Sequence, residues 1–200
     1  ILGCFSGQKG SIQVCPDLPL LKGKTALVTG PTSGIGRETV AGLLARGSHV
    51  VLAGRSCKKL RALIDGLADD GYDTDALTPV ICDLADLDSV ALAVQEINKL
   101  LRMKPLDILV ENAGIMPVKY SETPQGHEIS FGTNVLGHFA LRAGLLRGCL
   151  SEKARVIILT GDIYVFSDSC SPDFRWRTPL GGIKAYNCLL YTSPSPRDIG

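Results

Sequence analysis

The sequence has few metal-binding side chains, and none of them is clustered. Its seven cysteines include no Cys-x-x-Cys pair, and its three histidines are widely separated. Structural zinc sites need grouped cysteine and histidine ligands, and disulfide frameworks or redox centres need paired cysteines. We therefore expect no metal site. Reduced, partly buried thiols favour a cytoplasmic location.

The sequence also lacks an excess of either charge, is poor in aromatic residues and has no long apolar run. There are 21 basic and 20 acidic residues, and aromatics make up 6% of the chain. Nucleic-acid and anionic-membrane partners are therefore not expected. No run approaches the roughly 20 apolar residues of a membrane span. The chain does not begin with methionine, so an upstream anchor or targeting segment stays open.

What the sequence does contain is enough apolar material for one globular domain. Hydrophobic residues make up 45% of 200 positions, as in a chain that buries a core. Residues 1–21 have no hydrophobic period and predict an irregular lead-in. We place one domain at 22–188 and treat 189–200 separately, because that run loses helical periodicity and contains two prolines.

The stretch 29–36 is predicted to be a glycine turn between a strand and a helix. In dinucleotide-binding folds such a turn lets the backbone approach a pyrophosphate, and the N-H groups of the first helical turn bind it. On these residues alone, a glycine-rich turn without a ligand is an equal alternative. The candidate cofactor-binding residues of this turn are Gly30, Thr32, Ser33, Gly34, Ile35 and Gly36.

Apolar runs and helix-patterned runs alternate along the chain. Alternation of this kind predicts an α/β fold, a Rossmann-type doubly wound parallel sheet, truncated after its fifth strand and the start of a following helix. The expected strands are 24–29, 49–53, 78–82, 106–110 and 154–160, and the expected helices are 35–46, 57–67, 87–101 and 127–146.

The end of the second predicted strand bears on the choice of cofactor. An NAD enzyme places an acidic residue there to bind the adenosine ribose. This chain has Arg55 instead, and Arg37 follows the glycine turn. Arginine favours a 2'-phosphate, so NADP is expected and NAD is less favoured. The alternative is that both arginines are solvated surface residues.

Three motifs together resemble the short-chain dehydrogenase/reductase family. They are the Gly-x-x-x-Gly-x-Gly turn, Asn112-Ala113-Gly114 and Tyr186, and the resemblance covers about 22–188. The long spacing from Gly161 to Tyr186 is similar to the retinol dehydrogenase and protochlorophyllide reductase branch. The resemblance implies an oxidoreductase that moves hydride between a nicotinamide and a small-molecule carbonyl or alcohol.

The resemblance also implies roles for individual residues. Asp83 and Leu84 would meet the adenine ring, although Asp83 also suits a local turn before a helix. Asn112, Ala113 and Gly114 would lie beside the cofactor, with Glu111 in place of the first of two asparagines usual in the family. The whole protein is expected to form a homo-oligomer, as family members commonly do.

The catalytic set implied by the resemblance is incomplete. Tyr186 would transfer the proton, Asn134 would distort its helix and support a proton relay, and Thr160 would stand in for a serine expected at 161. The position four residues after Tyr186, where the family has lysine, is Leu190. We expect residues 189–200 to be a non-native tail. A nucleotide-binding sensor or scaffold without turnover is the alternative function.

Overall fold

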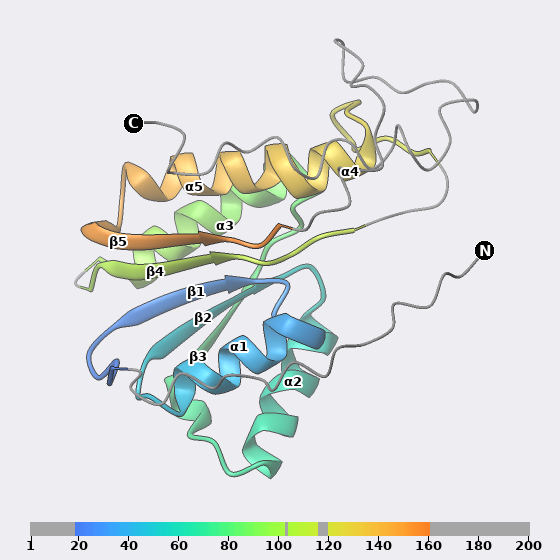
Figure 1. Ribbon diagram of the computed structural model, residues 1–200. Helices are drawn as coiled ribbons and strands as arrows, with labels where there is room; N and C mark the ends of the chain where they lie inside the picture. Colours follow the sequence, from blue (N-terminus) through green and yellow to red (C-terminus); the bar gives the residue numbers. More distant parts are fainter. Residues whose placement is uncertain (1–18, 103, 116–119, 161–200) are drawn as a thin grey trace, which may run out of the picture.

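The computed structural model describes residues 19–102, 104–115 and 120–160. They form a five-stranded parallel sheet in the order β3-β2-β1-β4-β5 (Figure 1). The predicted doubly wound α/β fold is confirmed. The strands are β1 (Thr25–Thr29), β2 (His49–Gly54), β3 (Leu77–Ile81), β4 (Leu106–Glu111) and β5 (Leu150–Ile158).

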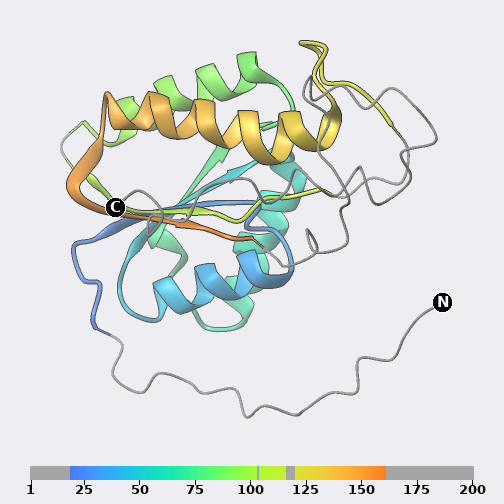
Figure 2. The same cartoon turned by 45° about the horizontal axis from the view of Figure 1, so that its top comes forward.

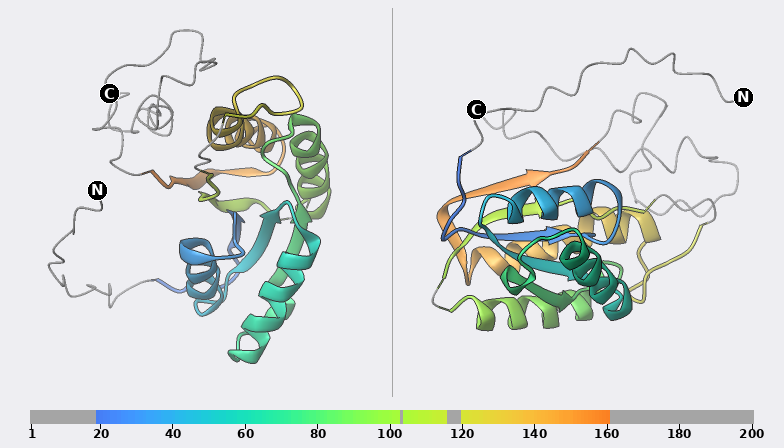
Figure 3. Two further views of the ribbon diagram at one scale, coloured as in Figure 1. Left: turned by 90° about the vertical axis from the view of Figure 1, so that its right-hand side faces the viewer. Right: turned by 90° about the horizontal axis from the view of Figure 1, so that it is seen from below.

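Helices cover both faces of the sheet. Two of them, α1 (Gly34–Leu44) and α2 (Cys57–Asp69), pack on one face, and α3 (Leu87–Leu100) and α5 (His138–Leu146) lie side by side on the other (Figure 2). The views in Figure 3 show the three resulting layers. Parallel strands need such crossover helices, because the chain must return to the end of the sheet where the previous strand began before the next strand can start.

The strand sequences explain why both faces are covered. All five residues of β1 are buried, so no face of this strand meets water. Leu27 and Leu109 belong to a core under α3 and α5, whereas Val28 and Val110 belong to a second core under α1 and α2. Successive side chains of a strand point to opposite faces, and the continuous apolar runs supply both cores.

The long helix predicted for 127–146 is interrupted. It consists of α4 (Ile129–Phe131), a π-helical segment η2 (Gly132–Gly137) and α5, and the Glu128 carboxylate caps its start by accepting from Ser130 N and Phe131 N. Gly137 lies against the Leu84 carbonyl, where a Cβ atom would collide. A π-helical turn shifts the residues it contains relative to a regular helix, and here it contains Asn134.

The fifth strand begins at Leu150, four residues before its predicted start. Its pairing with β4 shifts register between Leu106 and Ile108. The polar run after Leu150 has no strand pattern of its own, so the early start depends on pairing with β4. A short 3-10 helix η1 (Thr74–Ala76) also lies within the predicted loop before β3.

Among the described residues, no helix is both long and apolar enough to span a bilayer. Most of the predicted lead-in, together with Tyr186 and the predicted tail, lies outside the described residues.

Candidate nucleotide-binding site

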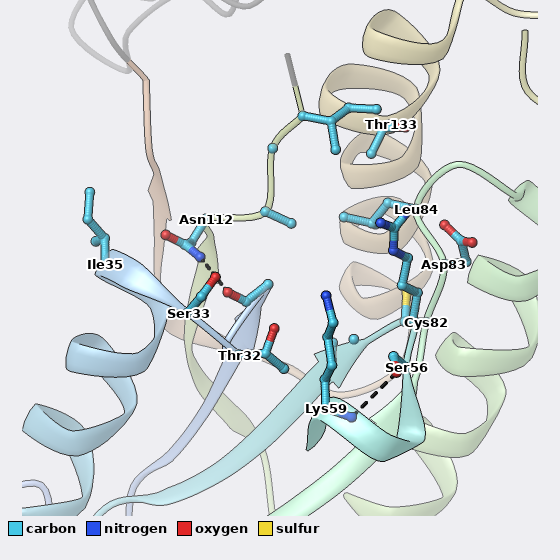
Figure 4. Close-up of a pocket in the computed structure, with 17 residues that line it drawn as sticks. Thr32, Ser33, Ile35, Ser56, Lys59, Cys82, Asp83, Leu84, Asn112 and Thr133 are labelled. Carbon is cyan, nitrogen blue, oxygen red and sulfur yellow. Dashed lines mark hydrogen bonds between the residues drawn. The ribbon is translucent and has the colours of Figure 1, made fainter. Parts of the chain in front are cut away.

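A cavity of about 390 Å³ opens at the carboxyl edge of the sheet (Figure 4). Its walls come from the turn after β1, the end of β2 with the start of α2, the segment after β3, and the segment after β4. Ligands of open parallel sheets bind at this edge, where strand order reverses. The lining residues are Gly30, Thr32, Ser33, Ile35, Ala53, Gly54, Arg55, Ser56, Lys59, Cys82, Asp83, Leu84, Asn112, Ala113, Gly114, Ile115 and Thr133.

The cavity brings together every residue predicted to bind cofactor except Gly34, Gly36 and Arg37. Gly36 lies beneath the turn instead, where an added Cβ would meet the Gly30 carbonyl and would lie 2.6 Å from Asn112 Nδ2. Gly30 has φ of +62° and is packed against Ala113. These two glycines therefore let the turn fold back onto the end of β4.

Asn112 joins the glycine turn to the end of β4. Its side-chain Nδ2 donates to the backbone oxygens of Thr29 and Gly30, at 2.9 Å each. Thr29 completes the connection, because its hydroxyl oxygen accepts from the backbone N-H groups of Asn112 and Ala113 at 3.0 Å each. Two walls of the cavity are thus held together by four hydrogen bonds, which fixes the spacing between them.

The start of α2 places two cations at one end of the cavity. Arg55 precedes the helix, Ser56 caps it by accepting from Lys59 N, and the Lys59 side chain rises into the cavity from the first turn (Figure 4). Within the described part of the chain, neither Arg55 nor Lys59 has an ion-pair partner. The sequence prediction missed Lys59, although its position four residues after Arg55 at a helix start was a usable signal.

The structure does not bring Arg37 to this end of the cavity. Its guanidinium pairs with Glu38, the next residue of α1, and with Asp70, the residue that follows α2, and both pairs are exposed. Arg37 does not line the cavity, and the two carboxylates pair with its charge. The cation that accompanies Arg55 in the cavity is Lys59.

Asp83 and Leu84 form the wall after β3. The Asp83 carboxylate accepts from Ala85 N at 3.0 Å, so the local turn expected for this residue is present. Asp83 N also donates to the Ser89 hydroxyl. The helix cap itself is Asp86, whose carboxylate accepts from Asp88 N. Asp83 therefore lines the cavity in a conformation that its own side chain fixes.

The Asn134 side chain hydrogen-bonds to the backbone of Ile115, which lines the cavity after β4. Its Oδ1 accepts from Ile115 N and its Nδ2 donates to the Ile115 oxygen, both at 2.9 Å. Thr133, the preceding residue, lines the cavity, and its buried hydroxyl has no hydrogen-bond partner among the described atoms. The helix distortion that the family resemblance implies for Asn134 is present as η2.

Of the other two predicted catalytic residues, only Thr160 lies within the described residues. Thr160 is exposed beyond the end of β5 and does not line the cavity. Tyr186 falls outside the described residues, and so does position 161.

A polar cluster supports the cavity wall formed by Asn112 and Ala113, from the face of the sheet that α5 covers. It consists of the buried Thr29, Glu111 and His138 and the half-buried Arg142. His138 Nε2 lies 2.9 Å from Thr29 Oγ1, and Arg142 Nη1 donates to Glu111 Oε2 at 2.8 Å. Burial raises the pKa of Glu111 to about 7, against the opposite pull of Arg142, and burial lowers the pKa of His138.

Comparison with known proteins identifies the fold and motifs. The family model for short chain dehydrogenase matches residues 24–164. The chain belongs to the short-chain dehydrogenase family. The resemblance inferred from the glycine turn, Asn112-Ala113-Gly114 and Tyr186 is confirmed.

Curated relatives place this short-chain dehydrogenase in the branch suggested by its sequence. It is 36% identical over 178 residues to retinol dehydrogenase 14 of Mus musculus, covering 82% of this chain and 52% of the relative. It is 34% identical over 150 residues to polyprenol dehydrogenase of Homo sapiens, covering 72% and 44%. The chain thus spans about half the length of the curated relatives it matches.

Solved structures agree with this assignment. A protein of Mycobacterium Paratuberculosis, described as uncharacterized, is 30% identical with a TM-score of 0.72, covering 87% of this chain and 59% of that one. A short chain dehydrogenase from Burkholderia cenocepacia, solved in complex with NADP, is 26% identical with a TM-score of 0.62, covering 84% and 63%.

The residues of this short-chain dehydrogenase fit a dinucleotide. The glycine turn lines the cavity, and Gly30 lets it pack directly against the end of β4, because an added Cβ there would lie 2.8 Å from the Ala113 Cα. Thr133 offers a buried hydroxyl that lacks a partner among the described atoms. Arg55 and Lys59 offer two charges at the start of α2 that form no ion pair with any described residue. The family's nicotinamide cofactor would supply or accept a hydride here.

Proposed function

We propose that the whole protein is an NADP-dependent oxidoreductase acting on a small-molecule alcohol or carbonyl. The observation that carries the choice of NADP is the position of Arg55 and Lys59, which line one end of the cavity without ion pairs in the described structure. A 2'-phosphate would pair with both, whereas the ribose hydroxyls of NAD would leave two cations without an anion.

The start of α2 adds to this preference. The helix has 13 residues, and its cap Ser56 and its first-turn residue Lys59 both line the cavity. The helix dipole favours an anion at this position, by typically about 0.3–1 kcal/mol. No acidic residue stands at the end of β2, where one would accept hydrogen bonds from ribose hydroxyls and repel a phosphate.

For the chemical step, we propose that Tyr186 transfers the proton while Asn134 supports the relay. Asn134 already fixes Ile115 at the cavity wall. Thr160 would orient the substrate oxygen. The relatives named for retinol and polyprenol point to an alcohol as the substrate. A cytoplasmic location of the catalytic domain accords with the free thiols of Cys57, Cys82 and Cys149, the three cysteines in the described part of the chain.

The experiment that tests the choice of cofactor is a fluorescence titration of the whole protein with NADPH and with NADH. We expect tighter binding of NADPH. The variant Arg55→Asp should reverse the order, because a charge-assisted bond of about 1.5–3 kcal/mol is exchanged for repulsion. Arg61→Asp is the matched control, since Arg61 is exposed on α2 outside the cavity and its replacement should leave the order unchanged.

The second candidate function is nucleotide binding without turnover, as in a sensor or scaffold. The residue four positions after Tyr186 in the whole protein distinguishes the two candidates: a lysine there favours the enzyme, and an uncharged residue, such as the Leu190 of this sequence, favours the binding protein. A protein that binds NADPH but reduces no aldehyde or ketone in a broad substrate panel would support this candidate. Equal affinity for NADPH and NADH would instead contradict the NADP proposal.

A further inference from the structure

Thr29 makes more hydrogen bonds than a single hydroxyl usually makes. Its oxygen accepts from Asn112 N and Ala113 N at 3.0 Å each, and it lies 2.9 Å from His138 Nε2. The hydroxyl can also donate to the Val110 oxygen, at 3.4 Å, but this distance is longer than the 2.9 Å to His138 Nε2. All of these contacts are on the α5 face, directly behind the cavity wall that holds Asn112 and Ala113.

The hydrogen bonds determine which nitrogen of His138 carries its proton. Nδ1 lies 2.9 Å from the backbone oxygen of Asn134, and a carbonyl oxygen can only accept. Nδ1 therefore carries the hydrogen, and in the neutral ring Nε2 is an acceptor. The Thr29 hydroxyl donates to Nε2, which leaves both lone pairs of its oxygen for the two backbone N-H groups.

A second proton on His138 would break this arrangement. Nε2 would become a donor aimed at Thr29 Oγ1, whose two lone pairs already accept from Asn112 and Ala113. One of the three donors would lose its acceptor. In a buried site an unsatisfied donor is costly, so the wall would shift or the histidine would turn.

The surroundings of His138 keep it neutral. The residue is 4% exposed, and burial together with the charge of Arg142 on the next turn of α5 lowers its pKa. Glu111, at the end of β4, pairs with Arg142 and is the acidic member of the cluster. Arg142 is thus the charged group that acts on the ring, and Glu111 is its partner from the sheet.

We propose that His138 is a positioning residue for the nucleotide site: as a neutral ring it accepts the Thr29 proton and so keeps the Thr29 oxygen available to hold the backbone of Asn112 and Ala113. This role rests on the proposed nucleotide site, but the hydrogen bonds on which it depends form without nucleotide.

The first test is hydrogen exchange of the whole protein without nucleotide. His138→Leu removes the acceptor, and the amides of Asn112 and Ala113 should exchange about three- to tenfold faster, the equivalent of one ordinary hydrogen bond. His138→Gln keeps an acceptor near Nε2 and should restore most of the protection. It also keeps the test valid if the leucine variant does not fold.

The chain supplies a matched control in His49. Its Nε2 lies 3.0 Å from Thr78 Oγ1, so it forms the same kind of histidine–threonine bond at the other edge of the sheet. His49 is also partly buried and its pKa is also lowered. His49→Leu should leave the exchange of Asn112 and Ala113 unchanged. Equal acceleration by His49→Leu and His138→Leu would overturn the proposal.

The second test is the pH profile of NADPH affinity. Wild-type affinity should fall on acidification below the usual titration range of histidine, as His138 gains its second proton. His138→Gln should lose that step and keep any step due to the nucleotide's own phosphate. Glu111→Gln should keep the acid step, which separates His138 from Glu111.

The outcomes distinguish this inference from the proposed function. Unchanged exchange of the Asn112 and Ala113 amides in both His138 variants, or identical pH profiles for wild type and His138→Gln, would overturn the positioning role. Failure of the wild type to bind NADPH at any pH would refute the proposed function, and the exchange experiment would still decide the role of His138.

Discussion

Arg142 engages only one oxygen of the Glu111 carboxylate. Its Nη1 donates to Oε2 at 2.8 Å, while Oε1 is buried with no partner among the described atoms. The whole Glu111 residue is 4% exposed. Burial therefore outweighs the pull of Arg142, and the pKa of Glu111 rises from 4.5 to about 7.

This pair predicts a pH-dependent contribution to stability. The folded protein holds a proton on Glu111 up to about pH 7, whereas the unfolded chain releases it near pH 4.5. The contribution of Glu111 to the free energy of unfolding is therefore present below pH 4.5 and falls as the pH rises to about 7. Glu111→Gln should remove this fall.

The measurement is urea unfolding of wild type and Glu111→Gln at pH 5 and at pH 8. The prediction concerns the difference in unfolding free energy between the two proteins at each pH, because the other titrating groups are common to both. Glu152→Gln, at an exposed position of β5, is the control. The same loss of stability from pH 5 to pH 8 in wild type and Glu111→Gln would contradict the prediction.

Two glycines of α1 allow the effect of packing on stability to be measured apart from the effect of helix propensity. Gly36→Ala should destabilise the protein by about 1–3 kcal/mol, because the new methyl group would collide with the turn and with Asn112. Gly42→Ala, on the same helix, meets nothing within 4 Å and should stabilise by about 0.5–1 kcal/mol. Thermal melts of both variants check this, and equal shifts would refute the packing argument.

Lys59 should contribute to NADPH affinity although it is exposed. Lys59→Ala should weaken NADPH binding about tenfold and leave NADH binding nearly unchanged, since only the 2'-phosphate offers it a charge partner. Lys58→Ala is the matched control, because the neighbouring lysine does not line the cavity. Parallel losses for NADPH and NADH in Lys59→Ala would instead indicate a structural effect.

Tyr186 should carry the proton in the whole enzyme. Tyr186→Phe should lower kcat by about 10²- to 10⁴-fold, the usual contribution of a placed acid, with NADPH affinity unchanged. Steady-state kinetics with a turned-over aldehyde or alcohol provides the measurement. An unchanged rate would assign the proton to another group.

Much of the fold was predictable because the strands carry their own signal. The β1 and β4 runs are apolar on both faces, and their observed limits differ from the predicted ones by a residue. The start of β5 was not predictable. Its first residues are polar, and they become a strand only by pairing with β4 across a register shift.

The site was predictable where backbone geometry creates it and unpredictable where side chains from distant elements meet. The glycine turn and Asn112 follow from motifs. Arg37 was expected at the cavity because it is close in sequence, yet Asp70, 33 residues away, takes its charge. The Glu111–Arg142 pair joins β4 to α5, and the residues next to either one in the sequence do not indicate this pairing.

The hydrogen bonds that shape the cavity join residues far apart in the chain. Asn112 lies 82 residues from Gly30, and His138 lies 109 from Thr29. Such contacts are costly to close and favour late formation in folding. The nucleotide would then bind the native state but not the folding transition state, because the contacts that shape the cavity form only after it. Added NADPH should slow unfolding in a chevron experiment while the refolding rate stays unchanged, so the cofactor would prolong the lifetime of the folded enzyme without guiding its folding.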